Sequence, residues 1–382
     1  MTVTLIGCGC GSLTCESRAA IESAELVIGS SRLLREYGGG KPQSEAVTAP
    51  AIKAAIESAD GKNICVLYSG DSGFYSGARL LLPELEGHDV RLLPGVSSVQ
   101  TFAAKLKKPW QDWLLCSAHG VDCDAVAAVC RGRPAFFLTG GRQGPAEICR
   151  TLTDAGLGFL KVYAGEDLGT AADFSTRSFS PLSVLLIEPA PRYPRRTPGL
   201  PDLDFLRAEK VPMTKQEARA AALSKLAVTP EDVCWDIGAG TGSVAIELAL
   251  QCRAVYGVER EDAALSVAEQ NRRKFGAWNL RLVKGEAPAA LAALPKPDAV
   301  FVGGSGGQLG EILEAIRAAN PAARICVSAI TIESLHNANS LLRELGCETE
   351  VTQLSVSRSK PAGGLTLMLA QNPVWLVTGY AK

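Results

Sequence analysis

A glycine-rich turn in the second half of the chain constrains the fold more than any other feature. The apolar run 233–237 is typical of a buried strand, Gly238, Gly240 and Gly242 follow it directly, and a helix-like pattern begins at Ser243. Glycines let the backbone turn tightly and come close to a ligand, and the start of a helix offers free N–H groups. The pattern predicts a strand, a turn and a helix of a parallel α/β sheet, with a nucleotide-type ligand at the turn.

The spacing of these glycines indicates which ligand. A dinucleotide fingerprint has its third glycine three residues after the second, but here that position is Ser243, and Gly242 comes two residues after Gly240. The next predicted strand ends at Glu259, 21 residues after Gly238, where a carboxylate would accept hydrogen bonds from ribose hydroxyls. The loop resembles the first motif of class I S-adenosylmethionine methyltransferases. A nucleotide-dependent dehydrogenase and a purely structural turn are the alternatives.

A proline-rich segment, residues 188–202, marks a domain boundary, because its five prolines disfavour helices and central strands and favour an extended, exposed tether. Strands and helices alternate on both sides of it, which predicts α/β domains with largely parallel strands. Before the segment, we expect strands at 3–6, 26–28, 64–68, 90–93, 113–116 and 135–138, and helices at 51–59, 76–85, 99–106 and 145–155. After it, we expect helices at 215–226 and 243–250, and strands at 233–237, 254–258, 280–283, 299–302, 324–328, 348–356, 365–370 and 374–378. The last strands predict antiparallel edges on a doubly wound parallel sheet.

The composition of the chain disfavours several classes of function. Its 382 residues include 39 Lys and Arg against 40 Asp and Glu, so there is no basic excess to neutralise a nucleic-acid backbone. No apolar run reaches the ~20 residues of a membrane helix and the start lacks the basic region of a signal peptide, so we expect no membrane partner and a cytoplasmic location. The 12 cysteines include the cluster Cys8, Cys10 and Cys15, but they form no Cys-x-x-Cys pair and the chain has three histidines. We therefore expect small core residues and no metal.

Three further segments of the second half carry candidate functional residues. Thr214 and Glu217 have the Thr-x-x-Glu form of a helix capping box. The loop Gly303–Gly307 follows a predicted strand at the carboxyl edge of the sheet, where open α/β sheets bind ligands, and it either closes on a substrate or simply turns. Arg358 and Lys360 stand in a small-residue turn between strands, where they would bind carboxylates of an acidic substrate or form a solvated hairpin tip.

Several motifs of the second half occur in a familiar order: Thr214, the glycine turn, Glu259, Gly285–Pro288, Gly303–Gly307 and Ser357–Pro361. This order resembles the decarboxylating methyltransferases of cobalamin biosynthesis that methylate carbon 15 of precorrin-6B, and it covers nearly all of residues 203–382. The resemblance implies a Rossmann-like class I fold that binds S-adenosylmethionine through Thr214, Gly238, Ala239, Gly240, Thr241, Gly242, Glu259, Glu286 and Ala287. It also implies that the substrate is contacted by Gly303, Gly304, Ser305, Arg358 and Lys360.

The first half carries three motifs of its own, namely Ser69–Tyr75, Leu93–Ser98 and Ser117–Gly120. They resemble successive motifs of the tetrapyrrole methylase superfamily, in the branch that methylates carbon 5 of the same macrocycle. The resemblance implies a fold of two α/β subdomains with a cleft between them. It also implies that a second S-adenosylmethionine is held there by Asp71, Pro94, Gly95, Val96 and Ser97, with His119 on the substrate side.

Some of these residues have structural alternatives. Asp71 could cap the following helix, and His119 could be a satisfied core residue. Gly70–Gly73 also matches the nucleophile motif of trypsin-like proteases, but those are antiparallel proteins that need His and Asp partners, which the predicted parallel strand and the three histidines disfavour. Near the start of the chain, Cys10 stands where the superfamily usually has proline, and the path from Gly7 to Thr14 is shorter.

Together the two halves resemble the bifunctional precorrin-6Y C5,15-methyltransferases (decarboxylating). We expect a tetrapyrrole methylase domain at 1–188, a linker at 189–202 and a class I methyltransferase domain at 203–382. The resemblance implies methylation of precorrin-6B, or of its cobalt form, at carbons 5 and 15, with loss of carbon dioxide from the ring C acetate and one S-adenosylmethionine per domain. We also expect a homo-oligomer. The departure at Cys10 motivates the alternative that only the second half is catalytic and the first half binds or channels the tetrapyrrole.

Overall fold

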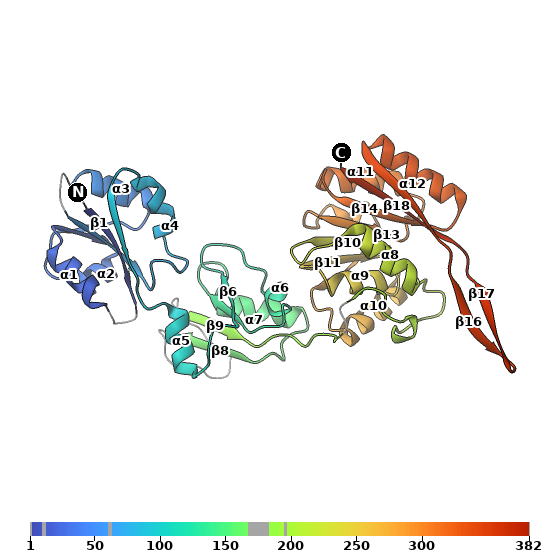
Figure 1. The fold of residues 1–382 in the computed structure, drawn as a ribbon, viewed down its shortest axis with the longest axis horizontal. Helices are drawn as coiled ribbons and strands as arrows, with labels where there is room; N and C mark the ends of the chain where they lie inside the picture. The colour runs from blue at the N-terminus through green and yellow to red at the C-terminus, as the bar shows by residue number, and fades with distance from the viewer. Residues whose placement is uncertain (1, 10–12, 60–62, 167–182, 195–196, 382) are drawn as a thin grey trace. The chain divides into compact units, whose positions relative to one another are not determined.

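The computed structural model describes residues 2–9, 13–59, 63–166, 183–194 and 197–381 (Figure 1). The chain divides into two compact units. Unit 1 holds residues 1–123, 133–149 and 161–188, and unit 2 holds residues 124–132, 150–160 and 189–382. The strands among the described residues form four sheets, and the candidate sites are built on the five-stranded sheet of unit 1 and the seven-stranded sheet of unit 2.

The first sheet of unit 1 has five parallel strands in the order β3-β2-β4-β1-β5. The strands are β1 (Thr2–Cys8), β2 (Leu26–Gly29), β3 (Gln43–Glu45), β4 (Ile64–Ser69) and β5 (Asp89–Leu93). One face packs against α1 (Cys15–Ser23) and α2 (Ser31–Tyr37). The other packs against α3 (Ala49–Glu57), α4 (Ala78–Leu81) and the 3-10 helix η1 (Leu82–Leu85). The helix expected over 76–85 is therefore a single α-helical turn that tightens at Pro83, because proline has no N–H to continue the α-helical pattern.

The second sheet of unit 1 is mixed, with the order β6-β7-β9-β8. Its strands are β6 (Leu114–Ser117), β7 (Ala135–Leu138), β8 (Val162–Glu166) and β9 (Ser183–Ile187), and β6 and β7 are parallel while β9 is antiparallel to both of its neighbours. Three helices lie along this part of the chain, α5 (Ser98–Leu106), α6 (Ala125–Val129) and α7 (Pro145–Asp154). Phe136 of β7 packs on Phe102 of α5 and stacks on Trp113 at a centroid distance of 6.1 Å. The aromatic cluster thus joins α5 to the sheet.

Unit 2 contains a seven-stranded sheet in the order β12-β11-β10-β13-β14-β18-β15. The strands are β10 (Val233–Ile237), β11 (Ala254–Glu259), β12 (Leu280–Lys284), β13 (Ala299–Val302), β14 (Arg324–Ala329), β15 (Cys347–Leu354) and β18 (Val374–Ala381). The first five are parallel and β18 is antiparallel to both neighbours, which confirms the predicted doubly wound sheet with antiparallel edge pairing. The order reverses between β10 and β13, and such a switch point opens a crevice at the carboxyl ends of the strands.

Helices cover both faces of this sheet. One face packs against α8 (Gln216–Leu226) and α9 (Ser243–Ala249), and the other packs against α11 (Leu309–Ala319) and α12 (Ile332–Glu344). Unit 2 also contains α10 (Asp262–Lys274), the short 3-10 helices η2 (Asp202–Asp204) and η3 (Ala289–Leu291) and, by the division given above, α6. The two buried clusters hold the strands in register and leave their carboxyl edge as the place where loops of different strands meet.

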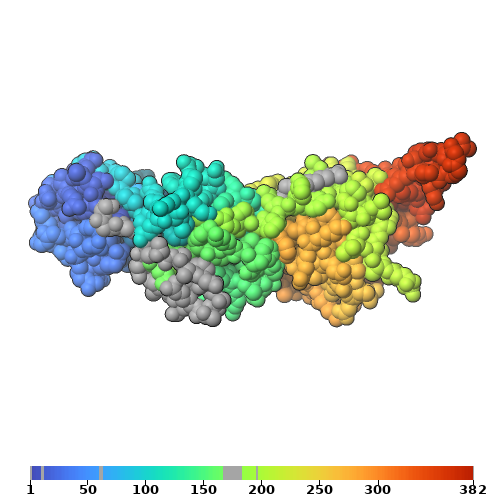
Figure 2. All heavy atoms as spheres, turned by 90° about the horizontal axis from the view of Figure 1, so that it is seen from below, coloured from blue at the N-terminus to red at the C-terminus, as the bar shows by residue number. Residues whose placement is uncertain are grey.

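A hairpin of β16 (Ser357–Ala362) and β17 (Leu365–Ala370) stands apart from the sheet of unit 2 and projects from it as an arm (Figures 1 and 2). The turn expected around Arg358 and Lys360 is therefore wrong, because both residues lie on β16 and the chain reverses at Gly363 and Gly364. Two adjacent glycines, one with a φ of +59°, make that reversal easier than the upstream residues would.

Two expectations about the segment before α8 are also wrong. The predicted exposed tether ends in buried residues: Leu200 is 0% exposed and Asp202 is 5% exposed. The predicted capping box does not form, because α8 is capped at Lys215 without a side-chain hydrogen bond. The carboxylate of Glu217 pairs with Arg358 instead, and the carbonyl of Thr214 accepts a hydrogen bond from Arg219. Contacts with distant residues thus override the local capping pattern.

Candidate active site

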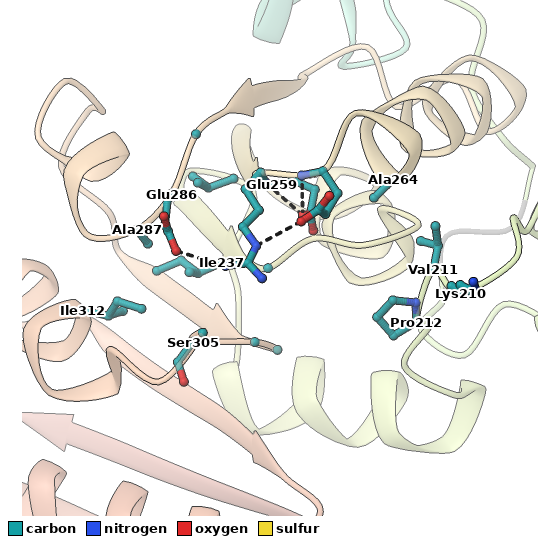
Figure 3. Close-up of a pocket in the computed structure, with 18 residues that line it drawn as sticks. Lys210, Val211, Pro212, Ile237, Glu259, Ala264, Glu286, Ala287, Ser305 and Ile312 are labelled. Carbon is teal, nitrogen blue, oxygen red and sulfur yellow. Dashed lines mark hydrogen bonds and ion pairs between the residues drawn. The ribbon is translucent and has the colours of Figure 1, made fainter.

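A pocket of about 320 Å³ opens at the carboxyl ends of β10, β11, β12 and β13 in unit 2 (Figure 3). In Figure 3, Glu286 and Ser305 lie on one side of it and Pro212 on the other, with Glu259 between them. Its walls are formed by Lys210, Val211, Pro212, Ile237, Gly238, Val258, Glu259, Arg260, Glu261, Ala264, Gly285, Glu286, Ala287, Gly303, Gly304, Ser305, Gly306 and Ile312. The pocket therefore lies at the switch point of the sheet, where the glycine turn predicted a ligand.

The glycines of this turn are required for two reasons. Gly238, Gly240 and Gly242 have φ values of +75°, +55° and +75°, which favour glycine. A Cβ atom on Gly238 would lie 2.8 Å from the backbone N of Gly304, and one on Gly240 would lie 2.7 Å from the carbonyl oxygen of Pro212. The turn is thus pressed between two loops that form opposite walls of the pocket, and a side chain on it would push one of them away.

The carboxylate of Glu259 is held by three backbone N–H groups. Its Oε2 accepts a hydrogen bond from Gly240 at 2.9 Å, and its Oε1 accepts from Arg260 at 2.8 Å and from Glu261 at 3.0 Å. A carboxylate has about four acceptor positions, so one remains for a ligand in the pocket. The side chain is oriented before a ligand arrives, which reduces the entropic cost of binding one.

Glu286, on the opposite wall, accepts hydrogen bonds from two other pocket elements. Its Oε1 lies 3.1 Å from Arg260 Nη1 and 3.4 Å from Gln308 Nε2. Arg260 follows β11, Glu286 follows β12, and Gln308 precedes α11, so the three side chains tie together the loops at the mouth of the pocket. All three are exposed or half-buried, so these contacts can exchange with solvent or with a ligand at low cost.

Asp236 is a buried acid beneath the glycine turn that the sequence analysis did not single out. Its Oδ2 accepts a hydrogen bond of 2.8 Å from the backbone N–H of Ala245 in the first turn of α9. Burial raises the pKa of Asp236 to about 7, the charge of Glu259 adds to the rise, and the hydrogen bond from Ala245 opposes it. The sequence does hold a signal, since an acid stands two residues before Gly238, but its position inside a predicted buried strand conceals it.

The predicted cofactor residues of unit 2 fall into two groups. Gly238, Glu259, Glu286 and Ala287 line the pocket. Ala239 and Thr241 are buried beneath it, so they support the turn from behind. The hydroxyl of Thr241 is buried and has no hydrogen-bond partner among the residues that the structure describes.

Thr214, Gly240 and Gly242 also lie outside the pocket lining. Gly240 backs onto Pro212, which is itself part of the wall, and a Cβ atom on Gly242 would lie 3.1 Å from Ala268 of α10. Thr214 is two residues beyond Pro212 and half-buried. These three residues shape the wall of the pocket rather than forming its surface.

The predicted substrate residues are divided between the pocket and the hairpin. Gly303, Gly304 and Ser305 line the pocket after β13, whereas Arg358 and Lys360 lie on β16. Arg358 already has partners within the chain: its Nη1 lies 3.0 Å from Asp202 Oδ2, and its Nε lies 3.1 Å from Glu217 Oε1. The hydrogen bond from Arg358 lowers the pKa of Glu217, so the pair stays charged at neutral pH.

A buried ion network continues from Arg358 into the core of unit 2. Arg219 is fully buried, and it donates to Asp202 Oδ1 at 2.9 Å and to Glu247 Oε1 at 2.8 Å. Glu247 in turn accepts from the backbone N–H groups of Gly199 at 2.7 Å and Leu200 at 3.0 Å. Burial raises the pKa of Asp202, but the hydrogen bonds from both arginines outweigh it and lower the pKa. The network fixes the segment that leads to the Lys210–Pro212 wall.

In unit 1, three predicted loops meet at the carboxyl ends of β1, β4 and β5. A Cβ atom on Gly95 would lie 2.3 Å from the carbonyl oxygens of Gly7 and Gly70, and one on Gly9 would lie 2.5 Å from the carbonyl oxygen of Val96. Neither Gly95 nor Gly9 has a left-handed φ. These glycines are therefore needed for close contact between backbones and not for their conformation.

Asp71 joins two of these loops. Its Oδ1 accepts from the backbone N–H of Gly95 at 3.1 Å, and its Oδ2 accepts from that of Gly73 at 3.0 Å. The alternative that Asp71 caps the following helix is wrong, because α4 begins at Ala78. Pro94 and Val96 flank Gly95, and Ser97 caps α5 through a capping box with Gln100. The predicted residues of this site thus lie together in one group of loops.

His119 lies in the loop after β6, at the end of the neighbouring sheet. Its Nδ1 is 3.4 Å from the carbonyl oxygen of Thr139, and its ring lies so close to Gly140 that a Cβ atom there would be 2.1 Å from Nδ1. The residue is exposed, so the alternative of a core histidine is wrong. Cys10 of the Gly7–Thr14 path lies outside the described residues.

Comparisons with known proteins test the family assignment. The family model described as tetrapyrrole (corrin/porphyrin) methylases matches residues 2–179, and the model described as a precorrin methyltransferase domain matches residues 206–379. A precorrin-6Y C(5,15)-methyltransferase [decarboxylating] of Sinorhizobium sp. is 31% identical over 387 residues, which cover 95% of this chain and 92% of that protein. This chain belongs to the precorrin-6Y C5,15-methyltransferase (decarboxylating) family.

Two further comparisons each cover half of this family member. A probable cobalt-precorrin-6B C(15)-methyltransferase (decarboxylating) of Pyrobaculum calidifontis is 46% identical over 193 residues, covering 50% of this chain and 99% of that protein. A crystal structure of a precorrin-6y C5,15-methyltransferase from Geobacter metallireducens is 37% identical, covers 50% of this chain and 100% of its own, and has a TM-score of 0.47.

Several pocket residues of this precorrin methyltransferase family member were not predicted from its sequence. Arg260 and Glu261 directly follow Glu259, so their place in the loop was a usable signal. Lys210–Pro212 had no such signal. No motif marks this segment, and the capping pattern before the next helix pointed to Thr214 instead. Its place in the wall depends on the contact between Gly240 and Pro212, which joins residues almost thirty positions apart in the sequence.

The cysteines have surroundings typical of core residues at six positions. Cys8, Cys65, Cys234, Cys252, Cys326 and Cys347 are buried, and burial raises the pKa of the Cys8 thiol to about 12. Among the described residues, no group of three or more His, Cys, Asp and Glu side chains is arranged to hold a metal ion. Within the same residues, every helix is too short or too polar to cross a membrane.

Proposed function

We propose that this chain methylates precorrin-6B, or its cobalt form, at carbons 5 and 15 and removes the carboxyl group of the ring C acetate. In this proposal, residues 1–188 act on carbon 5, residues 203–382 act on carbon 15 and on the acetate, and residues 189–202 join them. The main support is the relative with both activities in its name, which is 31% identical over 95% of the chain. The pocket at the switch point of unit 2 supplies a place for the chemistry of the second half.

S-adenosylmethionine fits the pocket of unit 2. Glu259 retains one acceptor position for a ribose hydroxyl. The wall holds the carboxylates of Glu259, Glu261 and Glu286 against the cations of Lys210 and Arg260, so it has a small excess of negative charge for a ligand that carries a sulfonium cation. A Cβ atom on Gly304 would meet nothing within 4 Å, so ligand atoms can approach the backbone there. When bound, this cofactor supplies an already activated methyl group, and the chain needs no nucleophile of its own.

The contribution of the chain to carbon 15 methylation is therefore positioning. The glycine turn, Glu259 and Glu286 would hold the nucleoside portion of the donor, and the Gly303–Gly306 loop would border its reactive end. Alignment of two reactants in one geometry can lower a barrier by ~7–11 kcal/mol. In the decarboxylation, the electron pair of the breaking carbon–carbon bond passes into the conjugated macrocycle, so the chain has to hold the acetate beside the ring and exclude water.

A second candidate function is that the first half only binds or channels the tetrapyrrole. This alternative is motivated by the departure from the superfamily pattern in the loop from Gly7 to Thr14. Residues 10–12 of that loop lie outside the described residues. We favour a second donor site, because Asp71, Gly95 and Val96 lie together at the carboxyl ends of three parallel strands. The two candidates differ in the number of donor molecules that the chain binds.

Calorimetric titration of the full chain with S-adenosylmethionine tests this number. We expect two sites in the wild-type chain, and in a Glu259→Gln variant one site of unchanged affinity and one weakened site, because an amide cannot accept all three backbone hydrogen bonds. One hydrogen bond to a charged group contributes about 1.5–3 kcal/mol, so affinity in unit 2 should fall by about tenfold or more. One site in the wild type, weakened in the variant, would favour a first half without a donor. No binding by the wild-type chain would contradict the proposal.

The proposal includes self-association through the hairpin. All six residues of β17 are exposed, and Leu365, Leu367, Met368 and Leu369 are each 45–73% exposed. By strand alternation, the three leucines share one face, where Lys360 lies directly opposite Leu367. An exposed apolar strand with open edges is a site for pairing with a second chain, and two copies of the same strand can pair antiparallel with each other.

Sedimentation velocity of the full chain tests the role of this hairpin. We expect an oligomer for the wild type and a smaller species for Leu367→Lys, with unchanged S-adenosylmethionine affinity. Thr366→Lys, on the other face of the same strand, is the matched control. A monomeric wild type, or an oligomer that Leu367→Lys leaves intact, would contradict self-association through β17.

A further inference from the structure

Two large aliphatic side chains are exposed beside the pocket of unit 2. Ile330 and Ile332 are 71% and 72% exposed, and they lie on either side of Thr331 between the end of β14 and the start of α12. Isoleucine is among the residues most often buried in proteins, so two neighbouring exposed isoleucines at the carboxyl edge of a sheet need an explanation.

Local structure does not explain them. An isoleucine directly before an N-cap often packs on the residue four positions into the helix, here Leu335, and Ile330 has the right position for this contact. Such packing would bury Ile330, which is instead mostly open to solvent. The backbone between the two side chains is fixed, because Thr331 Oγ1 accepts a hydrogen bond of 3.1 Å from the N–H of Ser334. The exposure therefore belongs to an ordered helix start.

The isoleucines continue the edge of the pocket. β14 is hydrogen-bonded to β13 in parallel register, with Val302 opposite Val327. Because parallel strands end at the same edge of a sheet, the loop after β14 begins beside the Gly303–Gly306 loop that forms the pocket wall. On its far side, the first residues of β18 pair with the last residues of β14, with Ala329 opposite Trp375.

The arrangement of charges sets the direction from which a methyl acceptor can approach. Glu259 and Glu286 follow β11 and β12, so the nucleoside portion of the proposed donor occupies that side of the switch point. An acceptor has to reach the donor from the other side, over β13 and β14. β14 is the next strand on that side of the sheet, and the loop that follows it carries Ile330 and Ile332.

We propose that Ile330 and Ile332 form an apolar platform on which one face of the macrocyclic substrate rests during carbon 15 chemistry. This inference rests on the proposed function. A tetrapyrrole ring presents a broad apolar face with carboxylates around its periphery, and two isoleucines on a rigid helix start suit that face while the carboxylates stay in water. Burial of the apolar ring face on the two side chains removes it from water, which contributes to substrate affinity. The two isoleucines are positioning residues for the acceptor and do not touch the donor.

Steady-state kinetics of the full chain test the platform. The readout is release of carbon dioxide from precorrin-6B in the presence of S-adenosylmethionine, because the proposed function assigns this step to the second half alone. For the double variant Ile330→Ser, Ile332→Ser, we expect KM for precorrin-6B to rise about tenfold or more and kcat to stay within about twofold. The dissociation constant of S-adenosylmethionine should not change. The matched control is Val351→Ser, which removes a 45% exposed aliphatic side chain from the middle of edge strand β15.

Each outcome decides between the inference and its alternatives. If the wild-type chain is active and the double variant has the same KM, the platform is wrong and the proposed function stands. The same result with a smaller oligomer in sedimentation velocity would assign the isoleucines to contact between chains. If Val351→Ser raised KM equally, the effect would be general and the platform would be wrong. A wild-type chain that releases no carbon dioxide would overturn the proposed function, and the inference with it.

Discussion

Both groups of candidate donor-binding loops combine a glycine with a carboxylate, but the glycine has a different role in each. In unit 2, Glu259 accepts the N–H of Gly240, and in unit 1, Asp71 accepts the N–H of Gly95. Gly240 has a left-handed φ, whereas Gly95 does not and is required because two carbonyl oxygens would lie 2.3 Å from a Cβ atom. Glycine thus serves both conformation and contact at Gly240, and contact alone at Gly95, so the same substitution should act differently at these two positions.

Gly95→Ala is the most severe test of this comparison. Because the new methyl group would meet backbone atoms on two sides, the loops after β1 and β4 have to separate, and overpacking of this kind costs about 3 kcal/mol or more. We expect a lower midpoint for unfolding of unit 1 in thermal or urea denaturation, with the unit 2 transition unchanged. Gly144→Ala is the control, because a Cβ atom there meets nothing within 4 Å. Equal stability of the two variants would refute the contact argument.

In unit 2, Asp236→Asn tests how the buried acid near the glycine turn affects stability. The pKa of Asp236 is about 7 in the folded chain and near 3.8 when unfolded, so between these values the folded state binds the extra proton. The contribution of this group to the free energy of unfolding is fully present below pH 3.8. It falls by about 1.4 kcal/mol per pH unit as the pH rises toward 7. The variant should lack this loss, so its stability relative to wild type should improve from pH 5 to pH 7 in urea denaturation. A constant difference between the two proteins would show that Asp236 titrates normally.

Asp71→Asn should have the smallest effect. Its amide oxygen can still accept from Gly95, but its NH₂ group cannot accept from Gly73, so one hydrogen bond is lost at a cost of about 1 kcal/mol. We expect a small decrease in the stability of unit 1 and an unchanged donor affinity in unit 2. A decrease as large as that of Gly95→Ala would mean that the carboxylate, and not the close backbone contact, holds the loops together.

Much of the fold could be predicted because its signals are local. β7, β10, β13 and β17 have the bounds that their apolar runs indicate, and the glycine turn identified the switch point of the sheet. The failures are at places where a distant residue decides the local structure. Thr214 and Glu217 satisfy a capping pattern, but α8 is capped at Lys215, and the carboxylate of Glu217 pairs with Arg358 from a strand 141 positions later.

The candidate site was predictable on one wall and not on the other. Gly238, Glu259 and Gly303 follow strands, and parallel strands bring their ends together, so their sequence positions imply a shared edge. Lys210–Pro212 lies in the wall through its close contact with Gly240, and no periodicity of the sequence encodes this contact. The exposed pair Ile330 and Ile332 was equally hidden, because an apolar residue before a helix is expected to be buried.

The buried network around Arg219 determines where the second enzyme begins. Asp202 lies before residue 203, yet its carboxylate pairs with the buried Arg219. The backbone N–H groups of Gly199 and Leu200 also lie before residue 203, and they donate hydrogen bonds to the buried Glu247. A fragment cut at residue 203 would leave an arginine and a glutamate buried with part of their partners removed, which costs several kcal/mol. Anyone who separates the two activities should therefore place the cut before Pro198, since the last residues of the apparent spacer are structural parts of the downstream protein.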